Sequence, residues 1–429
     1  MGILFTTLYV TFSHLSPEFI LPGIAPYRPL VWLFLLAVVA AVITVVGHSY
    51  PYRAPQNVLI AGFFGIILFS SAIQAGSAGM AAAFSNFVPS FAAFFLCAAT
   101  VRRTGHLRFL TVSLAIVGLY QAICGIAAYH SGGASPFVYM WPPIEEQVQG
   151  QAVTRRVRGL GFLNDPNDFA QFLLVMLPLL WTAWRKRAVV RNVVLVLAPS
   201  ALILWTILLT QSRGGLLGFG AIVLAALRKR LGNARSAVIT VVLVGGVMAS
   251  GAWQRGDISV HEDSAAGRVE AWGNGIAMWK SSPLWGVGFG KFGDHNEDEG
   301  GLTAHNSFVL CFAELGTLGY LLWLGLITAA MLDLSNLRKR LPVTEDLSRW
   351  ATAIRLSLIA YLTTAWFLSR TYDMTLFVLL GMGVAIVRMA ARESDQEIRI
   401  GFHRLASCTA GAACASVLLV YCTLWARLT

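Results

Sequence analysis

Residues 31–47, VWLFLLAVVAAVITVVG, form an apolar run that contains no charged side chain. A helix that crosses the hydrocarbon core of a bilayer needs about 20 predominantly apolar residues, so this run predicts a membrane-spanning helix. Similar runs recur along the chain and predict about 12 spans, with the shorter segment 3–13 as a weaker thirteenth. The predicted spans are residues 31–47, 57–75, 80–100, 108–129, 168–184, 192–210, 214–227, 236–253, 306–332, 350–368, 373–390 and 405–425.

The composition of the chain is that of a membrane protein. Hydrophobic residues make up 56% of its 429 residues, charged residues make up only 12%, and the mean hydropathy is +0.66. A soluble globular protein carries about 25% charged residues, so this chain has too few charges to cover a water-facing surface. We therefore expect an all-α polytopic membrane protein in which residues 1–429 form a single transmembrane domain.

The positive charge lies in short clusters between the apolar runs. The formal net charge is +11, but a nucleic-acid-binding protein would gather its basic residues on one face, so we expect no nucleic-acid partner. Short loops rich in Lys and Arg mark the cytoplasmic side of a membrane protein. The clusters, each separated from the next by a pair of spans, are Arg102, Arg103 and Arg108; Arg185, Lys186, Arg187 and Arg191; Arg228, Lys229, Arg230 and Arg235; Arg338, Lys339, Arg340 and Arg349; and Arg388, Arg392, Arg399 and Arg404.

The opposite side of the membrane receives the two long connections, residues 130–167 and 254–305, and the short turns at 211–213 and 369–372. These two connections are long enough to form a small extramembrane cap. The acidic stretch GDHNEDEG within the second one lacks the ordered spacing of a calcium loop. The 6 cysteines lie inside apolar runs and form no CxxC pair. We therefore expect neither a metal site nor a cofactor.

Several arginines fall on the side that should be poor in positive charge. Arg213 lies in the turn QSRGG, Arg268 in AAGRVEAW and Arg370 in the turn LSRTYD, while Arg158 follows two other arginines before GLGFLNDPNDFAQ. A guanidinium group presents a rigid fork of donors that matches a phosphate group, which indicates an anion site. Alternatively, each arginine is an interface anchor that reaches lipid head groups or a loop carboxylate. Arg213 and Arg370 lie in turns that are too short to do much except position these side chains, which favours an anion site.

One histidine lies at the outer start of a long predicted span. His305, in LTAHNSFVL, could accept a proton near neutral pH, or it could simply cap the helix or lie at the interface. Glu314 follows nine residues later and would lie about 13 Å further along a straight helix. A buried carboxylate of this kind forms a structural pair or belongs to a proton path, and the structural pair is the favoured interpretation.

Four segments occur in an order that resembles the O-antigen ligase and O-antigen polymerase superfamily. They are RGLGFLNDPNDFAQFLLVMLPLL, TQSRGGLLGF, GRVEAWGNGIAMWKSSPLWGVGFGKF and AHNSFVLCFAELGTLGYL. The resemblance covers residues from about Arg158 to Gly319, and the remaining spans agree in number and pattern. His305 and Gly316 also bracket ten residues, a spacing that resembles one seen in this superfamily.

The resemblance implies a membrane glycosyltransferase with a GT-C-like helical bundle, located in the bacterial inner membrane with its active site facing the periplasm. Such proteins move a glycan from undecaprenyl diphosphate to an acceptor hydroxyl without a metal, and direct displacement would invert the anomeric configuration. The acceptor is a lipid A core sugar in ligases, which we favour here, and a growing glycan in polymerases. Carried onto this chain, Arg213 and Arg268 would hold the diphosphate, with Arg370 and Arg158 as weaker candidates, and His305 would be the base or would orient the acceptor.

Two other functions are compatible with the spans. Some members of the superfamily look like proteins once proposed to transport bicarbonate, and Glu314 would suit an ion path. Transporters usually show internal repeats and broken helices near the bilayer midplane, and the sequence shows no such pair. A passive membrane assembly subunit is the third possibility, and it predicts that lysine can replace the outer arginines. Because the polar residues gather on one side, we favour an enzyme.

Overall fold

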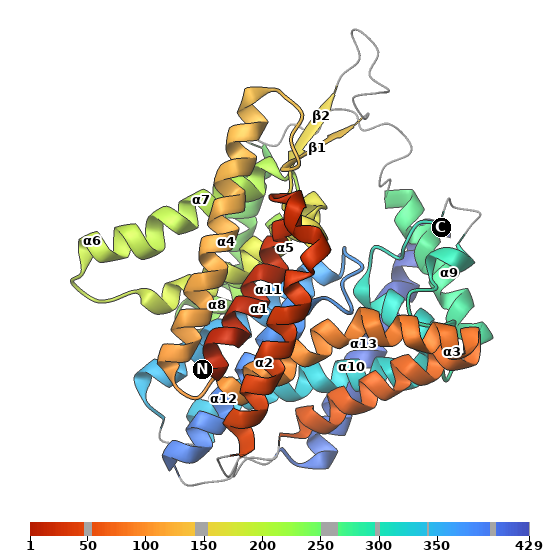
Figure 1. The fold of residues 1–429 in the computed structure, drawn as a ribbon. Coiled ribbons are helices and arrows are strands. Elements are labelled where there is room, and N and C mark those ends of the chain that lie inside the picture. Colours follow the sequence, from red (N-terminus) through yellow and green to blue (C-terminus); the bar gives the residue numbers. More distant parts are fainter. Residues whose placement is uncertain are drawn as a thin grey trace. The chain divides into compact units, whose positions relative to one another are not determined.

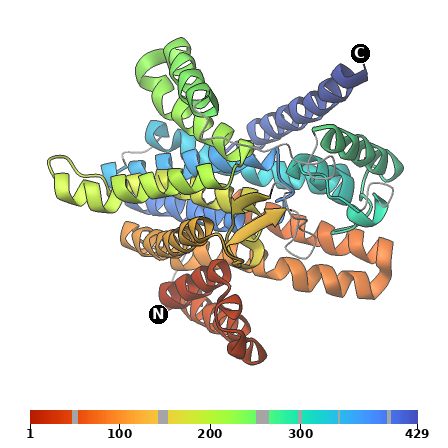
Figure 2. The ribbon, with the colours of Figure 1, turned by 90° about the horizontal axis from the view of Figure 1, so that it is seen from above.

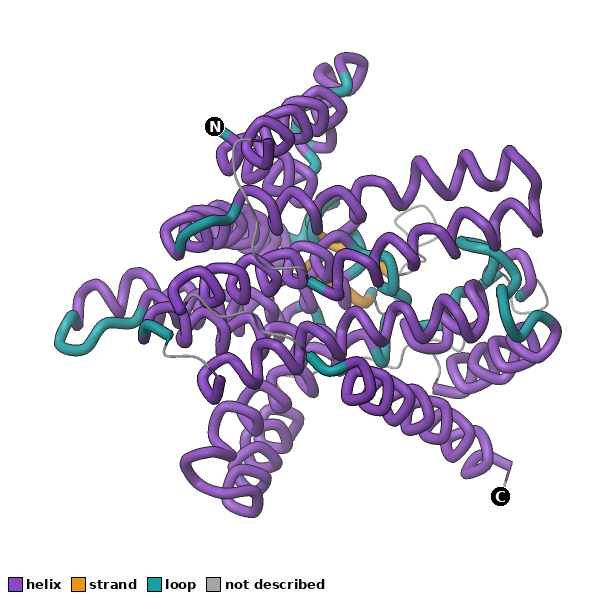
Figure 3. Tube along the Cα trace, turned by 90° about the horizontal axis from the view of Figure 1, so that it is seen from below, coloured by secondary structure: helices purple, strands orange, loops and turns teal. Residues whose placement is uncertain are grey.

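The computed structural model describes residues 1–46, 54–141, 153–249, 265–296, 301–340, 343–394 and 400–428. Helices account for nearly all of the regular structure in these ranges, and the two strands are short (Figure 1, Figure 3). Two parts of the connection 254–305 lie outside the described residues: residues 254–264 at its start, and residues 297–300 of its acidic stretch. The expectation of an all-α polytopic membrane protein is thus confirmed.

Among the described residues, 8 helices are long and apolar enough to cross a membrane. The predicted number of 12 spans stays a prediction. The predicted spans 57–75 and 80–100 fall in one helix, and three others, 168–184, 214–227 and 350–368, form helices or parts of helices that fall outside these limits. One of them, α5 (Pro166–Leu180), has 15 residues, and α1 (Gly2–Leu15), the weaker candidate, has 14. The helices that qualify are Pro29–Val46, Pro55–Thr100, Thr104–Ser131, Val189–Leu209, Arg230–Met248, Ser307–Leu337, Met374–Ser394 and Phe402–Ala426.

The chain divides into two compact units, each built from three stretches of sequence. The first unit comprises Met1–His48, Ala99–Ser259 and Glu345–Thr364, and the second comprises Ser49–Ala98, Val260–Thr344 and Ala365–Thr429.

The first unit is organised around α5, whose side chains are almost all buried. Gln171 in α5 donates hydrogen bonds to the Tyr361 carbonyl at 3.2 Å and to Thr364 Oγ1 at 2.7 Å, which ties α5 to α11. The remaining elements are α1 (Gly2–Leu15), η1 (Pro17–Phe19), η2 (Pro22–Tyr27), α2 (Pro29–Val46), α4 (Thr104–Ser131), β1 (Val138–Trp141), β2 (Thr154–Val157), η4 (Gly161–Leu163), η5 (Trp181–Ala183), α6 (Val189–Asn192), η6 (Val193–Leu197), α7 (Ala198–Leu209), α8 (Arg213–Ala249) and α11 (Glu345–Ala365).

A small antiparallel hairpin forms the ordered part of the connection 130–167. Strands β1 and β2 pair so that Val138 lies opposite Val157 and Tyr139 lies opposite Arg156. In Figure 2 the two strands lie beside the end of α4. The described part of this connection therefore contains a two-stranded sheet, and its place outside the membrane stays a prediction.

Three of the predicted basic clusters meet in the first unit. Asp346 at the start of α11 forms ion pairs with Arg108 at 3.6 Å and with Arg185 at 3.8 Å. Arg349, one turn later, donates a hydrogen bond of 3.2 Å to the Trp184 carbonyl. Residues from separate loops that were predicted to share one side of the membrane are thus brought together at one end of this unit.

Helix α8 reverses direction at Gly232, which has a φ of +79°. A Cβ atom at Gly220, which precedes Gly232, would lie 3.0 Å from Val244 and 3.1 Å from Thr240, which both follow Gly232. The halves on either side of Gly232 therefore pack against each other as a hairpin. This matches the two spans predicted at 214–227 and 236–253.

The second unit contains α3 (Pro55–Thr100, whose last two residues belong to the first unit), α9 (Ala265–Ser281), η7 (Gly293–His295), α10 (Ser307–Arg340), α12 (Met374–Ser394) and α13 (Phe402–Leu428). Helix α3 turns back at Ala75 and Gly76. Phe64 consequently contacts both Phe84 and Phe91 of the returning half, and the resulting hairpin is visible in orange in Figures 1 and 2. Helix α12 is buried along most of its length and forms the core.

Helix α10 is broken at Gly316, which has a φ of +64°. The ring of Phe308 lies 5.3 Å from that of Trp323, and Phe312 lies 5.6 Å from Tyr320. Because these pairs are arranged symmetrically about Gly316, the short first half packs back along the long second half. The span predicted at 306–332 is therefore divided at Gly316, and Glu314 lies before the break, on the same short half as the start of the helix.

Candidate functional site

Arg213 of the first unit lies at the first position of α8 and is exposed. Ser212 is buried just before it, and its Oγ accepts a hydrogen bond of 3.1 Å from Gly215 N. A serine at this position satisfies a backbone donor that would otherwise lack a partner. Gly215 packs closely, since a Cβ there would lie 3.2 Å from the Cβ of Ala170. The SRGG sequence thus forms a rigid turn that presents the guanidinium group of Arg213 outward.

Arg156 braces this turn, a role that the sequence did not suggest. Its side chain is only 4% exposed. Nε donates a hydrogen bond of 2.9 Å to the Thr210 carbonyl, and Nη2 donates one of 3.1 Å to Asn167 Oδ1. Arg156 therefore joins strand β2 to the end of α7 and to the start of α5, and it connects the segment that carries Arg158 to the turn that carries Arg213.

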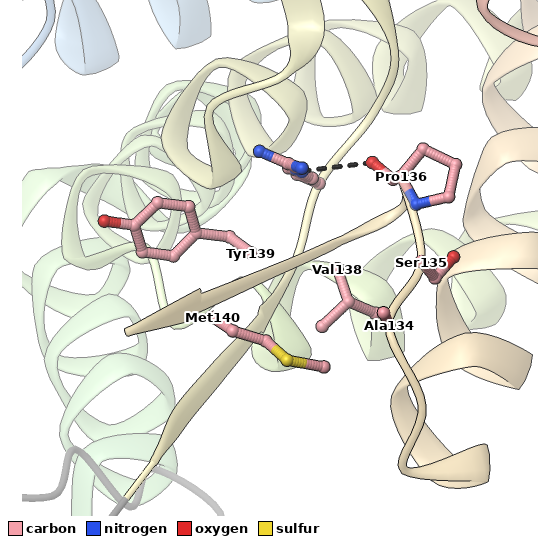
Figure 4. Close-up of a pocket in the computed structure, with 7 residues that line it drawn as sticks. Ala134, Ser135, Pro136, Val138, Tyr139 and Met140 are labelled. Atoms are coloured by element: carbon pink, nitrogen blue, oxygen red, sulfur yellow. Dashed lines mark hydrogen bonds between the residues drawn. The ribbon is translucent and has the colours of Figure 1, made fainter. Parts of the chain in front are cut away.

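Arg158 lines an open pocket of about 470 Å³ at the hairpin (Figure 4). Its Nε donates a hydrogen bond of 3.0 Å to the Pro136 carbonyl. Partial burial lowers the pKa of Arg158, and the Asp165 carboxylate opposes that shift. The other lining residues are Ala134, Ser135, Pro136, Val138, Tyr139 and Met140.

Arg155, the first of the three neighbouring arginines, has a structural environment. Its Nη2 donates hydrogen bonds to the carbonyls of Ala128 and Gly133, at 3.1 Å and 3.3 Å. Its guanidinium carbon lies 5.8 Å from the centre of the Tyr129 ring. Arg155 therefore fixes the end of α4, whereas Arg158 has a pocket beside it.

His305 of the second unit lies directly before α10 and has a φ of +47°. The next residue, Asn306, is fully buried and caps the helix, because its Oδ1 accepts hydrogen bonds from the backbone N–H groups of Phe308 at 2.9 Å and Val309 at 3.1 Å. His305 itself is half-buried. The histidine is thus held at a fixed, strained backbone position, and its neighbour performs the capping that was considered for His305.

Ser307 ties this helix start to the loop that carries Arg370. Its Oγ donates to the Leu368 carbonyl and accepts a hydrogen bond of 2.8 Å from Arg370 N. The Thr371 hydroxyl donates to the Ser307 carbonyl at 2.7 Å. These contacts fix the backbone of Arg370 to Ser307, which lies two residues after His305 in the chain.

The helix of Arg268 is joined to the same segment. Trp272 lies one turn after Arg268 in α9, and its Nε1 donates a hydrogen bond of 3.0 Å to the Ala304 carbonyl. The rings of Trp272 and Trp366 pack edge to face at 5.9 Å. The second unit thus holds the segments of Arg268, His305 and Arg370 together through direct hydrogen bonds, although these residues are far apart in sequence.

Glu314 lies at the end of the short half of α10 and is 2% exposed. Oε1 accepts a hydrogen bond of 3.1 Å from Phe292 N, and Oε2 accepts one of 2.8 Å from the Tyr372 hydroxyl. Burial raises the pKa of Tyr372 well above its ordinary value, and the negative charge of Glu314 is the second cause of this shift. The Tyr372 hydroxyl therefore keeps its proton and donates. These contacts favour a structural role for Glu314.

In the described part of the chain, no group of three or more His, Cys, Asp and Glu residues could hold a metal ion. Metal independence stays a prediction that needs an experiment.

Residues 198–324 match the model of a protein family described as O-antigen ligase. The matched segment contains Arg213, Arg268 and His305, and it leaves out Arg158 and Arg370. No curated protein matches the chain by sequence. The match confirms the resemblance, and three of the four sequence segments that indicated it lie inside the matched residues.

Proposed function

We propose that this chain, a member of the O-antigen ligase and O-antigen polymerase superfamily, transfers a glycan from undecaprenyl diphosphate to an acceptor hydroxyl. We place the reaction at the periplasmic face of the bacterial inner membrane, with a lipid A core sugar as the acceptor. The observation that supports this proposal most directly is the hydrogen-bonded framework of the second unit. It fixes Arg268, His305 and Arg370 on three connected segments.

The arginines would neutralise the leaving group. When the bond between the anomeric carbon and the diphosphate oxygen breaks, negative charge builds up on the diphosphate. Preorganised cationic donors stabilise such charge most effectively where water is excluded. We assign this role to Arg268 and Arg370 in the second unit. Arg213 and Arg158 of the first unit receive the same role from the resemblance to the superfamily, and Arg213 is well suited because its turn exposes the side chain.

His305 would act on the acceptor. The acceptor oxygen forms a bond to the anomeric carbon while the diphosphate leaves with the electron pair of the broken bond. The proton of the acceptor hydroxyl passes to the imidazole of His305. This single displacement inverts the anomeric configuration. Capping by Asn306 and the contacts of Ser307 would hold the imidazole in place during the step.

A transfer assay with purified components tests the proposal. The protein is reconstituted in vesicles with a lipid-linked glycan and a lipid A core acceptor, and the product is separated by size. We expect Arg268→Ala and His305→Ala to abolish transfer. Arg404→Ala is the matched control, because Arg404 is an exposed arginine in a predicted cytoplasmic cluster, and it should transfer like the wild type. Normal transfer by the first two variants would overturn the assignment.

A polymerase is the second candidate, because the matched superfamily includes both reactions and the same framework would serve either acceptor. The same assay separates the two. If the acceptor is another lipid-linked repeat unit, the product is a ladder of longer lipid-linked glycans, and the lipid A core sugar stays unmodified.

A further inference from the structure

The second unit contains a pocket of about 390 Å³ that the proposed reaction does not use. It lies between the turn of the α3 hairpin and the glycine-rich loop that follows α9. Its volume falls within the range of about 300–1,000 Å³ that is usual for small-molecule sites. The lining residues are Ser71, Gln74, Ala75, Ala78, Gly79, Ala82, Ala83, Asn86, Gly288, Phe289, Gly290 and Lys291.

We propose that this pocket binds an uncharged sugar residue of the glycan that the enzyme transfers or of the acceptor. This inference rests on the proposed function and adds a second subsite to it. The chemistry of the pocket differs from that of an anion site.

The polar groups of the pocket suit hydroxyl groups of a sugar. Gln74 and Asn86 supply amides, which can both donate and accept hydrogen bonds. Ser71 is 4% exposed, and its Oγ has no hydrogen-bond partner among the described residues. A buried hydroxyl without a partner costs free energy unless a ligand supplies one, so Ser71 is the strongest indication that a polar ligand belongs here.

The apolar part of the lining suits the flat face of a sugar ring. Small side chains from α3, among them Ala78 and Ala82, leave a smooth wall. Phe289 adds an aromatic ring on the side of the loop. Amide and hydroxyl groups beside small and aromatic surfaces match a pyranose, which has polar edges and apolar faces.

The charge of the pocket argues against a diphosphate ligand. Lys291 is the one cation among the described lining residues, and none of them carries a carboxylate. The Lys291 ammonium group forms an ion pair of 2.7 Å with Asp294. Its charge is therefore balanced locally, which favours a neutral ligand over a doubly charged one.

The loop that forms one wall of the pocket has a backbone conformation that favours glycine at three positions. Gly286, Gly288 and Gly290 all have positive φ angles, of +72°, +107° and +71°. Gln74 Nε2 donates a hydrogen bond of 3.0 Å to the Gly286 carbonyl and so fixes the loop against α3. At Gly288, a Cβ atom would lie 3.3 Å from the Cβ of Gln74. Larger residues would push the wall away from the helix.

The pocket is connected to the segment of Arg370. The ring of Phe289 packs against that of Tyr372 with centres 4.5 Å apart. Tyr372 lies two residues after Arg370 and holds Glu314. A sugar in the pocket would therefore lie against the same loop that fixes Arg370, as expected for a subsite that positions the glycan for transfer.

Steady-state kinetics of the reconstituted protein test the inference, with the lipid-linked glycan and the lipid A core acceptor varied separately. Ala82→Trp fills the pocket, and Asn86→Ala removes one amide with little risk to folding. We expect the KM for one substrate to rise by about tenfold, with kcat nearly unchanged. A tenfold rise corresponds to the loss of one or two hydrogen bonds. The substrate whose KM rises identifies the source of the sugar. Ala415→Trp, on an exposed position of α13, is the matched control.

Unchanged KM values for both substrates in both variants would overturn the subsite and leave the transferase assignment intact. If the wild type transfers nothing, the transferase assignment fails instead. The subsite is then tested by direct binding of the delipidated core oligosaccharide and of the glycan released from its lipid. Binding by the wild type that Asn86→Ala weakens supports the pocket, and equal binding by both contradicts it.

Discussion

The Tyr372 hydroxyl donates a hydrogen bond of 2.8 Å to Oε2 of Glu314, a residue 58 positions earlier in the chain. The other carboxylate oxygen accepts from Phe292 N. Glu314 therefore connects three segments of the second unit: the short half of α10, the glycine-rich loop and the loop of Arg370. Because both oxygens have donors inside the unit, this carboxylate can be buried without a cationic partner.

Tyr372→Phe should destabilise the protein without removing a catalytic group. The substitution leaves Oε2 of Glu314 without this donor in a buried position, which costs about 1–3 kcal/mol. We expect a lower midpoint of thermal unfolding, followed by tryptophan fluorescence in detergent. Glu314→Gln preserves the shape of the side chain and should retain most of the transfer activity. A folded Glu314→Gln protein without transfer would instead support the proton path that the sequence left open.

Gly316→Ala should prevent normal folding of α10. A Cβ at this position would lie 2.3 Å from the carbonyl carbon of Leu284, and the φ of +64° is unfavourable for alanine by about 1–2 kcal/mol. We expect little monodisperse protein in size-exclusion chromatography. Gly411→Ala in α13 is the control, because no atom lies within 4 Å of the added Cβ. A Gly316→Ala protein as stable as that control would show that the reversal of α10 is wrong.

This position also shows what the sequence could and could not predict. Hydropathy identified the long apolar helices, because an apolar run of sufficient length has few alternatives in a bilayer. It did not identify α9, which lies in the predicted connection 254–305. The same measure could not detect the reversal at Gly316, since one glycine barely changes the hydropathy of its window. The spacing of His305 and Gly316 was noticed only as a resemblance, and the structure gives a physical reason for it: the segment between them is the short half of α10.

The partners of the site residues were mostly beyond prediction for a related reason. Arg156 and Tyr372 act through contacts with residues that are distant in the sequence, and no local pattern reports such contacts. The positive-inside rule selected Arg213, Arg268 and Arg370 because it compares the two sides of a membrane. It could not distinguish the structural role of Arg156 from the position of Arg158 beside a pocket, because the two residues lie only two positions apart at the end of β2.

Arg156→Ala and Arg213→Ala should have opposite effects on stability and transfer. Removal of Arg156 leaves the Thr210 carbonyl and Asn167 without their donor in a buried region, so we expect a loss of about 2–5 kcal/mol of unfolding free energy. Arg213 is exposed, and its replacement should leave the unfolding midpoint unchanged while transfer falls at least tenfold. Thermal unfolding and the transfer assay on the same preparations compare the two. A destabilised Arg213→Ala protein would point to a structural role.

Asn306→Ala and Asn306→Asp separate capping from chemistry beside His305. Alanine removes the acceptor for the N–H groups of Phe308 and Val309, which costs about 1 kcal/mol. Aspartate keeps that acceptor, so its unfolding midpoint should stay close to that of the wild type. If the side chain only caps the helix, the aspartate variant also transfers normally. Loss of transfer with a normal midpoint would assign Asn306 a direct contact with substrate.

Transfer should continue when divalent metal ions are removed. In the proposed reaction the guanidinium groups of Arg268 and Arg370 neutralise the departing diphosphate, a task that otherwise falls to a divalent cation. Excess EDTA should therefore change the initial rate by less than about twofold, which is small beside the hundredfold effects of removing a catalytic charge. The Arg268→Ala variant provides a sharper comparison, because added Mg²⁺ should not restore its activity. A wild-type rate that EDTA abolishes and Mg²⁺ restores would show that the arginines do not perform this task alone.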